Sequence, residues 1–285
     1  MIALQENAAA AAAKLTPADK ERTLRSLMRK LQRVLVAYSG GVDSSYLAKI
    51  ATEELGQDAI CVIGLSPSVS KFQRDNAVRI AKSNGFNIRV LDTDELADPK
   101  YAANLGDRCY FCKSELYSKL AEVAADRDSV ILDGTNANDL GDHRPGRLAA
   151  SEHGVRSPLA EIGFTKHEIR ELSKAAGLET WDQPASPCLS SRVAVGVPVT
   201  LERLSSIERA EAALRQMGFR EFRVRVHGEL ARVEVSPAEL PAALDIELAG
   251  RIARELKVIG FKFVTLDLEG FRSGSLNVSN DTVKN

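Results

Sequence analysis

The residue types best suited to chemistry gather directly after the short apolar run 34–37. Two glycines follow this run and permit a tight turn, in which several backbone N–H groups can point into one concavity. An acidic residue and two serines then open a predicted helix, whose positive end would add to the attraction for an anion. The segment comprises Ser39, Gly40, Gly41, Val42, Asp43, Ser44 and Ser45. The pattern predicts a loop that binds nucleotide phosphates.

Ordinary helix capping is the alternative interpretation of this segment, because serine and aspartate also favour helix starts. The spacing Ser-Gly-Gly-x-Asp-Ser immediately after a strand is, however, a longer match than a glycine turn alone. The sequence has no Gly-x-x-x-x-Gly-Lys motif. Transfer of a terminal phosphoryl group is therefore the weaker hypothesis.

Three of the four cysteines form a second group of candidates. Cys109 and Cys112 have the spacing of a chelating pair, and Cys188 lies far along the chain in a loop rich in proline and serine. Cys61 lies within an apolar run, which is typical of a small hydrophobic core residue. Four cysteines in 285 residues are too few for a disulfide framework. We expect free thiols or metal ligands.

Alternating apolar strands and amphipathic helices must position these residues. Strands are predicted at 34–37, 60–63, 88–91 and 130–132, and helices near 44–55, 70–84 and 113–125. This order predicts an α/β domain with a parallel sheet, whose ligands bind beyond the carboxyl ends of the strands.

A second, smaller domain is expected after a proline-rich loop near 184–198. There the pattern changes to a helix at 200–217, strands at 221–227 and 230–235, a helix at 237–257 and a strand at 261–268. The predicted organisation is a helical tail at 1–30, the α/β domain at 31–195, a small α+β domain at 196–277 and a disordered tail at 278–285. The smaller domain is expected to serve the substrate or oligomerisation.

Composition restricts the classes of function. The 38 basic and 39 acidic residues nearly balance, so no global field attracts nucleic acid. No apolar run approaches the roughly 20 residues that cross a bilayer. The alanine-rich stretch 8–13 precedes the first basic residue, which is the wrong polarity for a secretory signal. We expect a cytoplasmic protein that binds neither nucleic acid nor a membrane.

The segment from Ser39 to Ser45 resembles the PP-loop of the N-type ATP pyrophosphatases, such as GMP synthetase, NAD synthetase, asparagine synthetase and the tRNA thiolases. The resemblance implies a Rossmann-like fold of the adenine nucleotide alpha hydrolase type. It implies that the loop holds the phosphates of ATP, with Mg²⁺ at Asp43, while a substrate oxygen attacks the α-phosphorus. Two further segments are then expected near the adenosine: Gly64, Leu65 and Ser66, and Gly134, Thr135 and Asn136.

Further motifs narrow the resemblance to the LarE family, the pyridinium-3,5-biscarboxylic acid mononucleotide sulfurtransferases. The matching segments are 107–113, 133–139, 142–146, 187–192 and 267–274. The resemblance implies adenylation of a pyridinium carboxylate mononucleotide and its conversion to a thiocarboxylate, for the nickel-pincer nucleotide cofactor. It also implies a trimer-based homo-oligomer, and it leaves the sulfur donor open.

The same resemblance assigns the sulfur chemistry to Cys188. Members with that cysteine alone sacrifice it, and C–S cleavage leaves dehydroalanine. The additional Cys109 and Cys112 match a subgroup with a 4Fe-4S cluster on three cysteines, and we expect that cluster here. A structural zinc site, or two spare thiols beside a sacrificial Cys188, are the alternatives. Arg192 is expected near the Cys188 thiol, where it would lower the thiol pKa.

Several charged residues are candidates for the substrate. Arg223 and Arg225 alternate with valines, so on a strand they share one face and could clamp a phosphate or carboxylate. A solvated strand face is the alternative. Arg192 and Arg144 are further candidate contacts. Asp267 and Glu269 also share a face, which could serve a metal, a partner subunit or only the solvent.

Three rival functions remain open from the sequence. A tRNA thiolase would share the loop and the three cysteines, but this chain lacks terminal Cys-x-x-Cys pairs. Another adenylating synthetase of the PP-loop superfamily is the second rival. The third is a non-enzymatic module that binds adenine nucleotide, since a fold does not fix a function.

Overall fold

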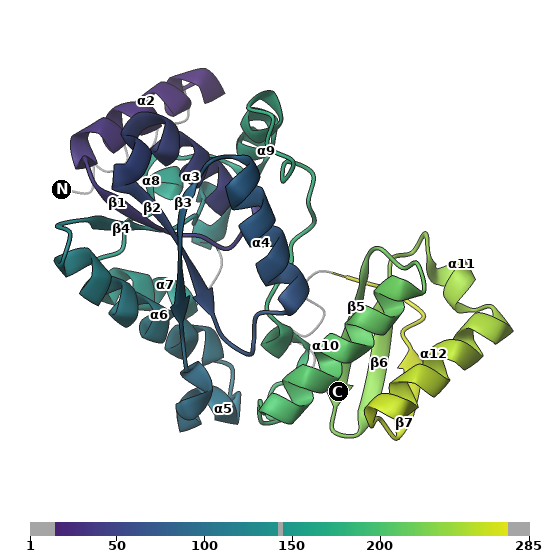
Figure 1. The fold of residues 1–285 in the computed structure, drawn as a ribbon. Coiled ribbons are helices and arrows are strands. Elements are labelled where there is room, and N and C mark those ends of the chain that lie inside the picture. Colours follow the sequence, from purple (N-terminus) through teal and green to yellow (C-terminus); the bar gives the residue numbers. More distant parts are fainter. Residues whose placement is uncertain (1–14, 142–144, 273–285) are drawn as a thin grey trace, which may run out of the picture. The chain divides into compact units, whose positions relative to one another are not determined.

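The computed structural model describes residues 15–141 and 145–272, which form two compact units (Figure 1). The first unit contains Met1–Glu95 and Asp107–Ser186, and the second contains Leu96–Gly106 and Pro187–Asn285. The sequence boundary at 195 therefore differs from this division. The short segment before Gly106 groups with the second unit because Asn104 Nδ2 donates to the carbonyls of Ala194 (2.8 Å) and Val197 (2.9 Å).

A parallel sheet forms the centre of the first unit, with strand order β3-β2-β1-β4. Its strands are β1 (Val34–Ala37), β2 (Ala59–Leu65), β3 (Asn87–Asp92) and β4 (Val130–Leu132). The two central strands are buried on both faces, as is usual for parallel sheets covered by helices. The predicted α/β class is confirmed.

Helices cover both faces of this sheet (Figure 1). They are α2 (Pro17–Leu31), α3 (Val42–Leu55), α4 (Lys71–Ser83), α6 (Arg108–Ala125), α7 (Pro145–Glu152), α8 (Pro158–Ile162) and α9 (Lys166–Ala175), with 3₁₀ turns η1 (Gly56–Asp58) and η3 (Ala137–Gly141). Val34 and Val36 pack into a core with residues of α2, α3, α4, α8 and α9, whereas Leu35 faces α6 and α7. Because strand side chains alternate between faces, β1 contributes to two cores.

Helix α6 begins at Arg108, five residues earlier than the start at 113 that the sequence predicted. Asp107 is its N-cap residue, and the Tyr110 hydroxyl donates to Glu152 Oε2 (2.7 Å) at the end of α7. The early start changes the environment of the cysteine pair, since Cys109 and Cys112 lie in the first turns of a helix and not in a loop.

The second unit contains a three-stranded sheet of order β5-β6-β7, in which β5 and β6 are antiparallel and β6 and β7 parallel. Its elements are η2 (Glu95–Ala97, which begins in the first unit), α5 (Pro99–Ala103), η4 (Leu189–Arg192), α10 (Leu201–Gln216), β5 (Phe222–His227), β6 (Leu230–Val235), α11 (Leu240–Ala243), α12 (Ile246–Ile259) and β7 (Phe263–Leu266). The single helix predicted at 237–257 is two helices. Asp245 separates them, because its Oδ1 accepts the N–H groups of Glu247 and Leu248 and so caps α12.

Within the part of the chain that the structure describes, no helix is both long enough and apolar enough to cross a membrane.

Candidate functional site

The turn between β1 and α3 depends on Gly40. Its φ is +75°, and a Cβ atom there would lie 2.6 Å from the Cβ of Ala77. Both the backbone conformation and the space therefore require glycine at this position. Gly41 is different, since its φ is −79° and its nearest neighbour, Ser39 Oγ, would be 3.4 Å from a Cβ.

The N-terminus of α3 is open. Its N-cap is Gly41, which has no side chain that could accept the N–H groups of the first turn. The Gly41 N–H itself donates to Ser39 Oγ (3.4 Å). The first intrahelical bond runs from the Ser45 N–H to the Gly41 carbonyl (2.9 Å), so the N–H groups before it have no partner within the helix. Helices α2, α4 and α9, in contrast, all begin with complete capping boxes. The capping interpretation of this segment therefore lacks support in the geometry.

The serine hydroxyls brace the turn from within. Ser39 Oγ and Ser44 Oγ lie 3.0 Å apart, the Ser39 N–H donates to Ser44 Oγ (3.2 Å), and the Ser44 hydroxyl donates to the Gly41 carbonyl (3.1 Å). Ser45 is completely buried beneath them. Hydrogen bonds within the segment thus hold the loop in its turn.

Asp43 is the only acidic residue in the first turn of α3. Burial raises the pKa of its carboxyl above the ordinary value, although a hydrogen bond and an ion pair with Lys166 act in the opposite direction. One carboxylate oxygen, Oδ2, contacts Lys166 Nζ. The other, Oδ1, is buried and has no hydrogen-bond partner among the described residues. A divalent cation is a chemically suitable partner for such an oxygen.

Lys166 lies beside the loop, and it was not among the residues predicted from the sequence. It is the first residue of α9, and its backbone N–H donates to Asn138 Oδ1 (2.8 Å). The signal was present but ambiguous, since Thr165 and Glu168 around it form an ordinary capping box. The fold places an ammonium group beside the loop from a residue 123 positions away.

The segment after β4 approaches the start of α3 closely. A Cβ atom on Gly134 would lie 2.9 Å from the Ser44 nitrogen, so only glycine permits this contact. Asp133 shapes the segment, because its carboxylate accepts hydrogen bonds from the Thr135 N–H (3.1 Å), the Ser157 hydroxyl (2.7 Å) and the Tyr117 hydroxyl (3.2 Å). The structure thus brings Gly134 to the loop, with Thr135 and the buried Asn136 directly following.

The candidate residues after the second strand are placed differently from the prediction. Gly64 and Leu65 are the last two residues of β2, and only Ser66 follows the strand. The Ser66 hydroxyl lies 2.6 Å from that of Ser68, which in turn donates to Glu95 Oε1 (2.8 Å). This chain of hydrogen bonds holds the segment at the carboxyl edge of the sheet.

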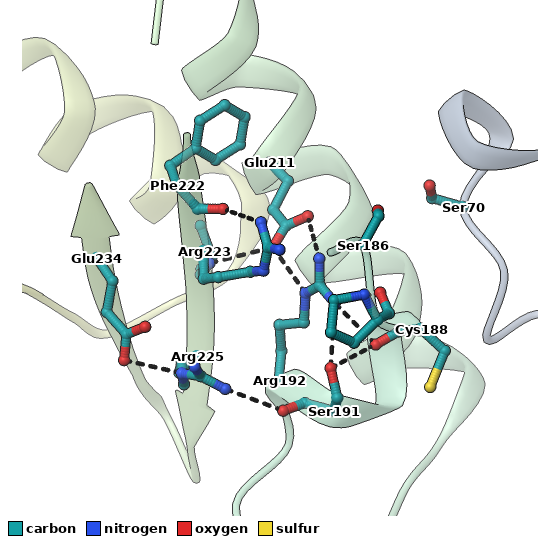
Figure 2. Close-up of polar contacts among 12 residues, drawn as sticks. Ser70, Ser186, Cys188, Ser191, Arg192, Glu211, Phe222, Arg223, Arg225 and Glu234 are labelled. Atoms are coloured by element: carbon teal, nitrogen blue, oxygen red, sulfur yellow. Dashed lines mark hydrogen bonds and ion pairs between the residues drawn. The ribbon is translucent and has the colours of Figure 1, made fainter. Parts of the chain in front are cut away.

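In the second unit, Arg192 holds the loop that carries Cys188 (Figure 2). Its guanidinium is almost fully buried, donates to both carboxylate oxygens of Glu211 (2.9 and 3.2 Å) and donates to the Cys188 carbonyl (2.9 Å). Figure 2 shows the Cys188 sulfur pointing away from this guanidinium. We expected Arg192 beside the thiol, but its hydrogen bonds hold the loop backbone.

Arg223 and Arg225 lie on the face of β5 opposite the buried Val224 (Figure 2). Arg225 donates to Glu234 Oε1 (2.8 Å) and to the Ser191 carbonyl (3.1 Å). Burial, with Arg192 nearby, lowers the pKa of Arg223 to about 10. Buried guanidinium groups that crowd one another favour an anion as an additional partner.

Two acidic candidates near the end of the described chain have local partners. Asp267 Oδ2 lies 3.6 Å from Arg232 Nε, and Asp267 Oδ1 accepts the Glu269 N–H (3.0 Å). Glu269 forms an ion pair with Arg272. A turn and two ion pairs therefore account for both carboxylates. Arg144, another candidate, lies outside the described residues.

None of the four cysteines, all of which the structure describes, forms a disulfide. Cys61 is buried, and burial raises its pKa to about 12, as suits an unreactive core residue. Cys109 and Cys112 belong to the first unit and Cys188 to the second. Among the described residues, no group of three or more His, Cys, Asp or Glu side chains is arranged to hold a metal ion. Cys109 and Cys112 are three residues apart on α6, a separation at which two thiolates can bind one metal centre.

A parallel sheet with this glycine turn, an open helix start and a close second loop defines an α/β protein of the PP-loop type. Consistent with this class, the chain is 26% identical over 267 residues to one subunit of the glutamine-hydrolyzing GMP synthase from Methanosphaerula palustris, covering 79% of this chain and 86% of that relative. No family model matches the chain.

Two relatives are more similar. An uncharacterized protein from Synechocystis is 44% identical over 260 residues, which are 91% of this chain and 97% of that protein. Pyridinium-3,5-bisthiocarboxylic acid mononucleotide synthase from Lactiplantibacillus plantarum is 39% identical over 264 residues, which are 92% of this chain and 95% of that enzyme. The chain belongs to the LarE family, that of the pyridinium-3,5-bisthiocarboxylic acid mononucleotide synthases.

Proposed function

We propose that this chain is an ATP-dependent sulfurtransferase that adenylates a pyridinium carboxylate mononucleotide and converts it to a thiocarboxylate in nickel-pincer nucleotide biosynthesis. The main support is the open N-terminus of α3 beside Asp43 and Lys166. The chain is also 39% identical to a pyridinium-3,5-bisthiocarboxylic acid mononucleotide synthase. The products besides the thiocarboxylate are AMP and pyrophosphate.

The reaction needs ATP because a carboxylate oxygen is a poor leaving group. In the first step a carboxylate oxygen of the substrate attacks the α-phosphorus, the bond to the bridging oxygen breaks, and pyrophosphate leaves. In the second step a sulfur nucleophile attacks the activated carbonyl carbon. The bond to AMP breaks, and AMP leaves with the bonding electrons.

The phosphates of ATP are assigned to the loop of Ser39, Gly40, Gly41, Asp43, Ser44 and Ser45. The open N–H groups of α3 would donate to the phosphate oxygens, and Lys166 would supply a positive charge to the departing pyrophosphate. Asp43 fits as a Mg²⁺ ligand, since its buried Oδ1 has no hydrogen-bond partner within the described chain. A bound Mg²⁺ would spread the charge that develops on the phosphates.

The adenosine is assigned to the carboxyl ends of β4 and β2, the two strands that flank β1. Gly134 closely approaches Ser44, and Thr135 and Asn136 follow it. Gly64, Leu65 and Ser66 lie at the end of β2, on the other side of β1. Backbone groups at such strand ends commonly contact nucleotides.

The acidic mononucleotide is assigned chiefly to Arg223, with Arg225 beside it. Arg225 donates to the fully buried Glu234, and Arg223 donates to the Phe222 carbonyl (2.6 Å). Burial and the nearby Arg192 lower the pKa of Arg223. An incoming phosphate or carboxylate would counter this crowding of positive charge. Arg192 is assigned to holding the Cys188 loop, and Arg144 remains a proposed contact from the sequence.

The sulfur chemistry is assigned to Cys188. Cys109 and Cys112, one helical turn apart at the start of α6, are suited to two thiolate ligands of a 4Fe-4S cluster, with Cys188 as the proposed third. Such a cluster would supply a site for an additional sulfide. The alternative is a sacrificial Cys188, whose thiolate displaces AMP and whose Cβ–S bond then breaks by loss of the Cα proton, leaving dehydroalanine. The sulfur donor to a cluster would be external.

The enzyme is further proposed to act in the cytoplasm as a trimer-based homo-oligomer, as the family resemblance implies.

The function is tested by incubating the anaerobic full-length protein with ATP, Mg²⁺ and the dicarboxylate mononucleotide. We expect AMP, pyrophosphate and thiocarboxylate in a one-to-one-to-one ratio. Binding of ATP without pyrophosphate release would support a nucleotide-binding module in place of the enzyme. Pyrophosphate release with tRNA but not with the mononucleotide would support a tRNA thiolase.

The sulfur assignment is tested on the same samples. A cluster predicts about four irons per chain and an unchanged protein mass after several turnovers. A colourless, active protein that loses the mass of H₂S from Cys188 in step with product would establish the sacrificial route. Replacement of Cys109 or Cys112 by Ser should stop multiple turnover only if the cluster is correct.

The substrate assignment is tested by Arg223→Gln. Loss of a charge-assisted contact of about 1.5–3 kcal/mol predicts a roughly ten- to hundredfold higher KM for the mononucleotide. The KM for ATP should not change, and an unchanged KM for the mononucleotide would assign Arg223 to the fold.

A further inference from the structure

Lys20, on α2, is a buried lysine in the first unit. Only 6% of its surface is exposed, and it lies on the face of α2 that also buries Leu24 and Met28. Lysine is rarely buried without partners. Its Nζ donates to the carbonyl of Gly163 (2.7 Å) and to both carboxylate oxygens of Glu168 (2.7 and 2.8 Å). All three ammonium hydrogens therefore have acceptors.

These acceptors belong to the turn that joins α8 to α9. Gly163 ends α8 with a left-handed conformation (φ 84°), and Glu168 lies in the first turn of α9. The Glu168 carboxylate also accepts the Thr165 N–H (2.7 Å) and the Thr165 hydroxyl (2.9 Å). Burial raises the pKa of Glu168, but the hydrogen bonds from Lys20 and Thr165 outweigh it and hold the pKa below its ordinary value.

Lys166 is the first residue of this same helix. Its backbone is fixed by Asn138 and its ammonium group reaches Asp43 in the loop. A movement of the first turn of α9 would therefore move the ammonium group relative to the start of α3.

We infer that Lys20 and Glu168 are positioning residues, which fix the first turn of α9 so that Lys166 reaches the phosphates of the nucleotide. The inference rests on the proposed function for its kinetic consequence. The helix that precedes the loop in sequence thereby acts on the chemistry without contributing a catalytic group. Removing Lys20 would leave the partly buried Glu168 carboxylate without its cation and release the turn.

The test is a double-mutant cycle on the full-length protein, with the rate of pyrophosphate formation and the KM for ATP as readouts. The variants are Lys20→Met, Lys166→Gln and the combination of both. Lys20→Arg keeps the charge, and Lys30→Met is the matched control, because Lys30 is an exposed lysine on the same helix. Glu168→Gln removes the charge from the other side of the pair. Amide hydrogen exchange at residues 165–170 gives a readout that does not depend on activity.

Misplacement of a catalytic group by about 1 Å can cost about a hundredfold in rate, and we expect Lys20→Met to approach that loss. In the Lys166→Gln background, Lys20→Met should lower the rate little further. In the otherwise wild-type protein, Lys20→Arg should keep part of the rate that Lys20→Met loses, and Lys30→Met should have the wild-type rate. Exchange at 165–170 should accelerate in Lys20→Met and Glu168→Gln. The inference would be overturned if Lys20→Met lowered the rate of pyrophosphate formation equally with and without Lys166. Unchanged amide hydrogen exchange at residues 165–170 would overturn it as well. If wild type forms no pyrophosphate, the proposed function fails, and hydrogen exchange alone decides the positioning.

Discussion

The starts of α3 and α9 show two opposite ways to begin a helix. At α9, Thr165 and Glu168 complete a capping box, and Lys20 neutralises the carboxylate. At α3, Gly41 offers no side chain, and the N–H groups of the first turn have no capping partner among the described residues. The first arrangement satisfies the backbone with the protein's own atoms. The second leaves it available to an anion, as the proposed phosphate site requires.

The two helix starts meet through one contact, the ion pair of Lys166 with Asp43. Helix α9, whose start is capped, supplies the cation, and helix α3, whose start is not capped, supplies the carboxylate. These charges neutralise each other in the ion pair, and bound ATP with Mg²⁺ would give each a different partner. Changes at either start should therefore have different consequences for stability and for catalysis.

The largest effect is expected from Asp43→Asn. This change removes the proposed Mg²⁺ ligand, and pyrophosphate formation should fall by about a hundredfold or more. The thermal midpoint should not fall, because burial raises the pKa of Asp43 and its ionised form is thus costly to the fold. Parallel measurement of rate and thermal unfolding checks both points. A variant with the full rate would remove Asp43 from the mechanism.

The next largest effect is expected in the turn before α3, where Gly40→Ala should lower stability and Gly41→Ala is the matched control. Alanine at position 40 meets both a φ of +75° and a contact of 2.6 Å with Ala77, so stability should drop by about 1–2 kcal/mol or more and ATP binding should weaken. Alanine at position 41 meets neither obstacle. Chemical denaturation of both variants is the measurement, and equal stability would contradict the assignment of the strained turn to Gly40.

The parallel sheet and the loop could be predicted from the sequence because each depends on short contiguous segments. Val34 to Ala37, the glycine turn and Asp43 stand within one short segment, and local periodicity is enough to recognise them. The partnership of Lys166 with Asp43 was not predictable in that way, because the two are 123 residues apart and Lys166 sits inside an ordinary capping box.

Local signals also misplaced some element boundaries. The helix carrying Cys109 starts earlier than predicted, because its first turn lacks a strong sequence marker beyond Asp107. In the second unit, alternation placed Arg223 and Arg225 on one strand face, yet it could not indicate that Glu234 would hold Arg225. The split of α11 from α12 at Asp245 was missed because a cap inside an amphipathic stretch also suits a helix surface.

A smaller effect is expected from Gly41→Ser, which would give α3 the cap that it lacks. Serine suits the N-cap conformation observed at Gly41 (φ −79°, ψ 165°) and should stabilise the fold by a few tenths of a kcal/mol, roughly the gain of serine over glycine. The added hydroxyl would compete with phosphate for the same N–H groups, so the KM for ATP should rise. Thermal unfolding and ATP titration measure the two effects. Greater stability with unchanged ATP affinity would place the phosphates elsewhere.

The smallest effect expected is a displacement of the acid limb of the pH profile. Asp43 must be ionised to bind Mg²⁺, and burial raises its pKa above the ordinary 3.8 despite the opposing contact with Lys166. Because the folded-state pKa is raised, the carboxylate becomes protonated at a higher pH than in the unfolded chain, and pyrophosphate formation should decline as the pH falls through that raised value. Lys166→Gln removes the opposing cation, so its acid limb should move to still higher pH. The comparison requires profiles of kcat/KM for ATP in both proteins, because this parameter reports the free enzyme, in which Lys166 contacts Asp43. The profiles are limited to the pH range where circular dichroism shows both proteins folded. An acid limb that moves to lower pH in Lys166→Gln would mean that the lysine does not help to keep Asp43 ionised. The contact between the starts of α9 and α3 would then have no electrostatic role.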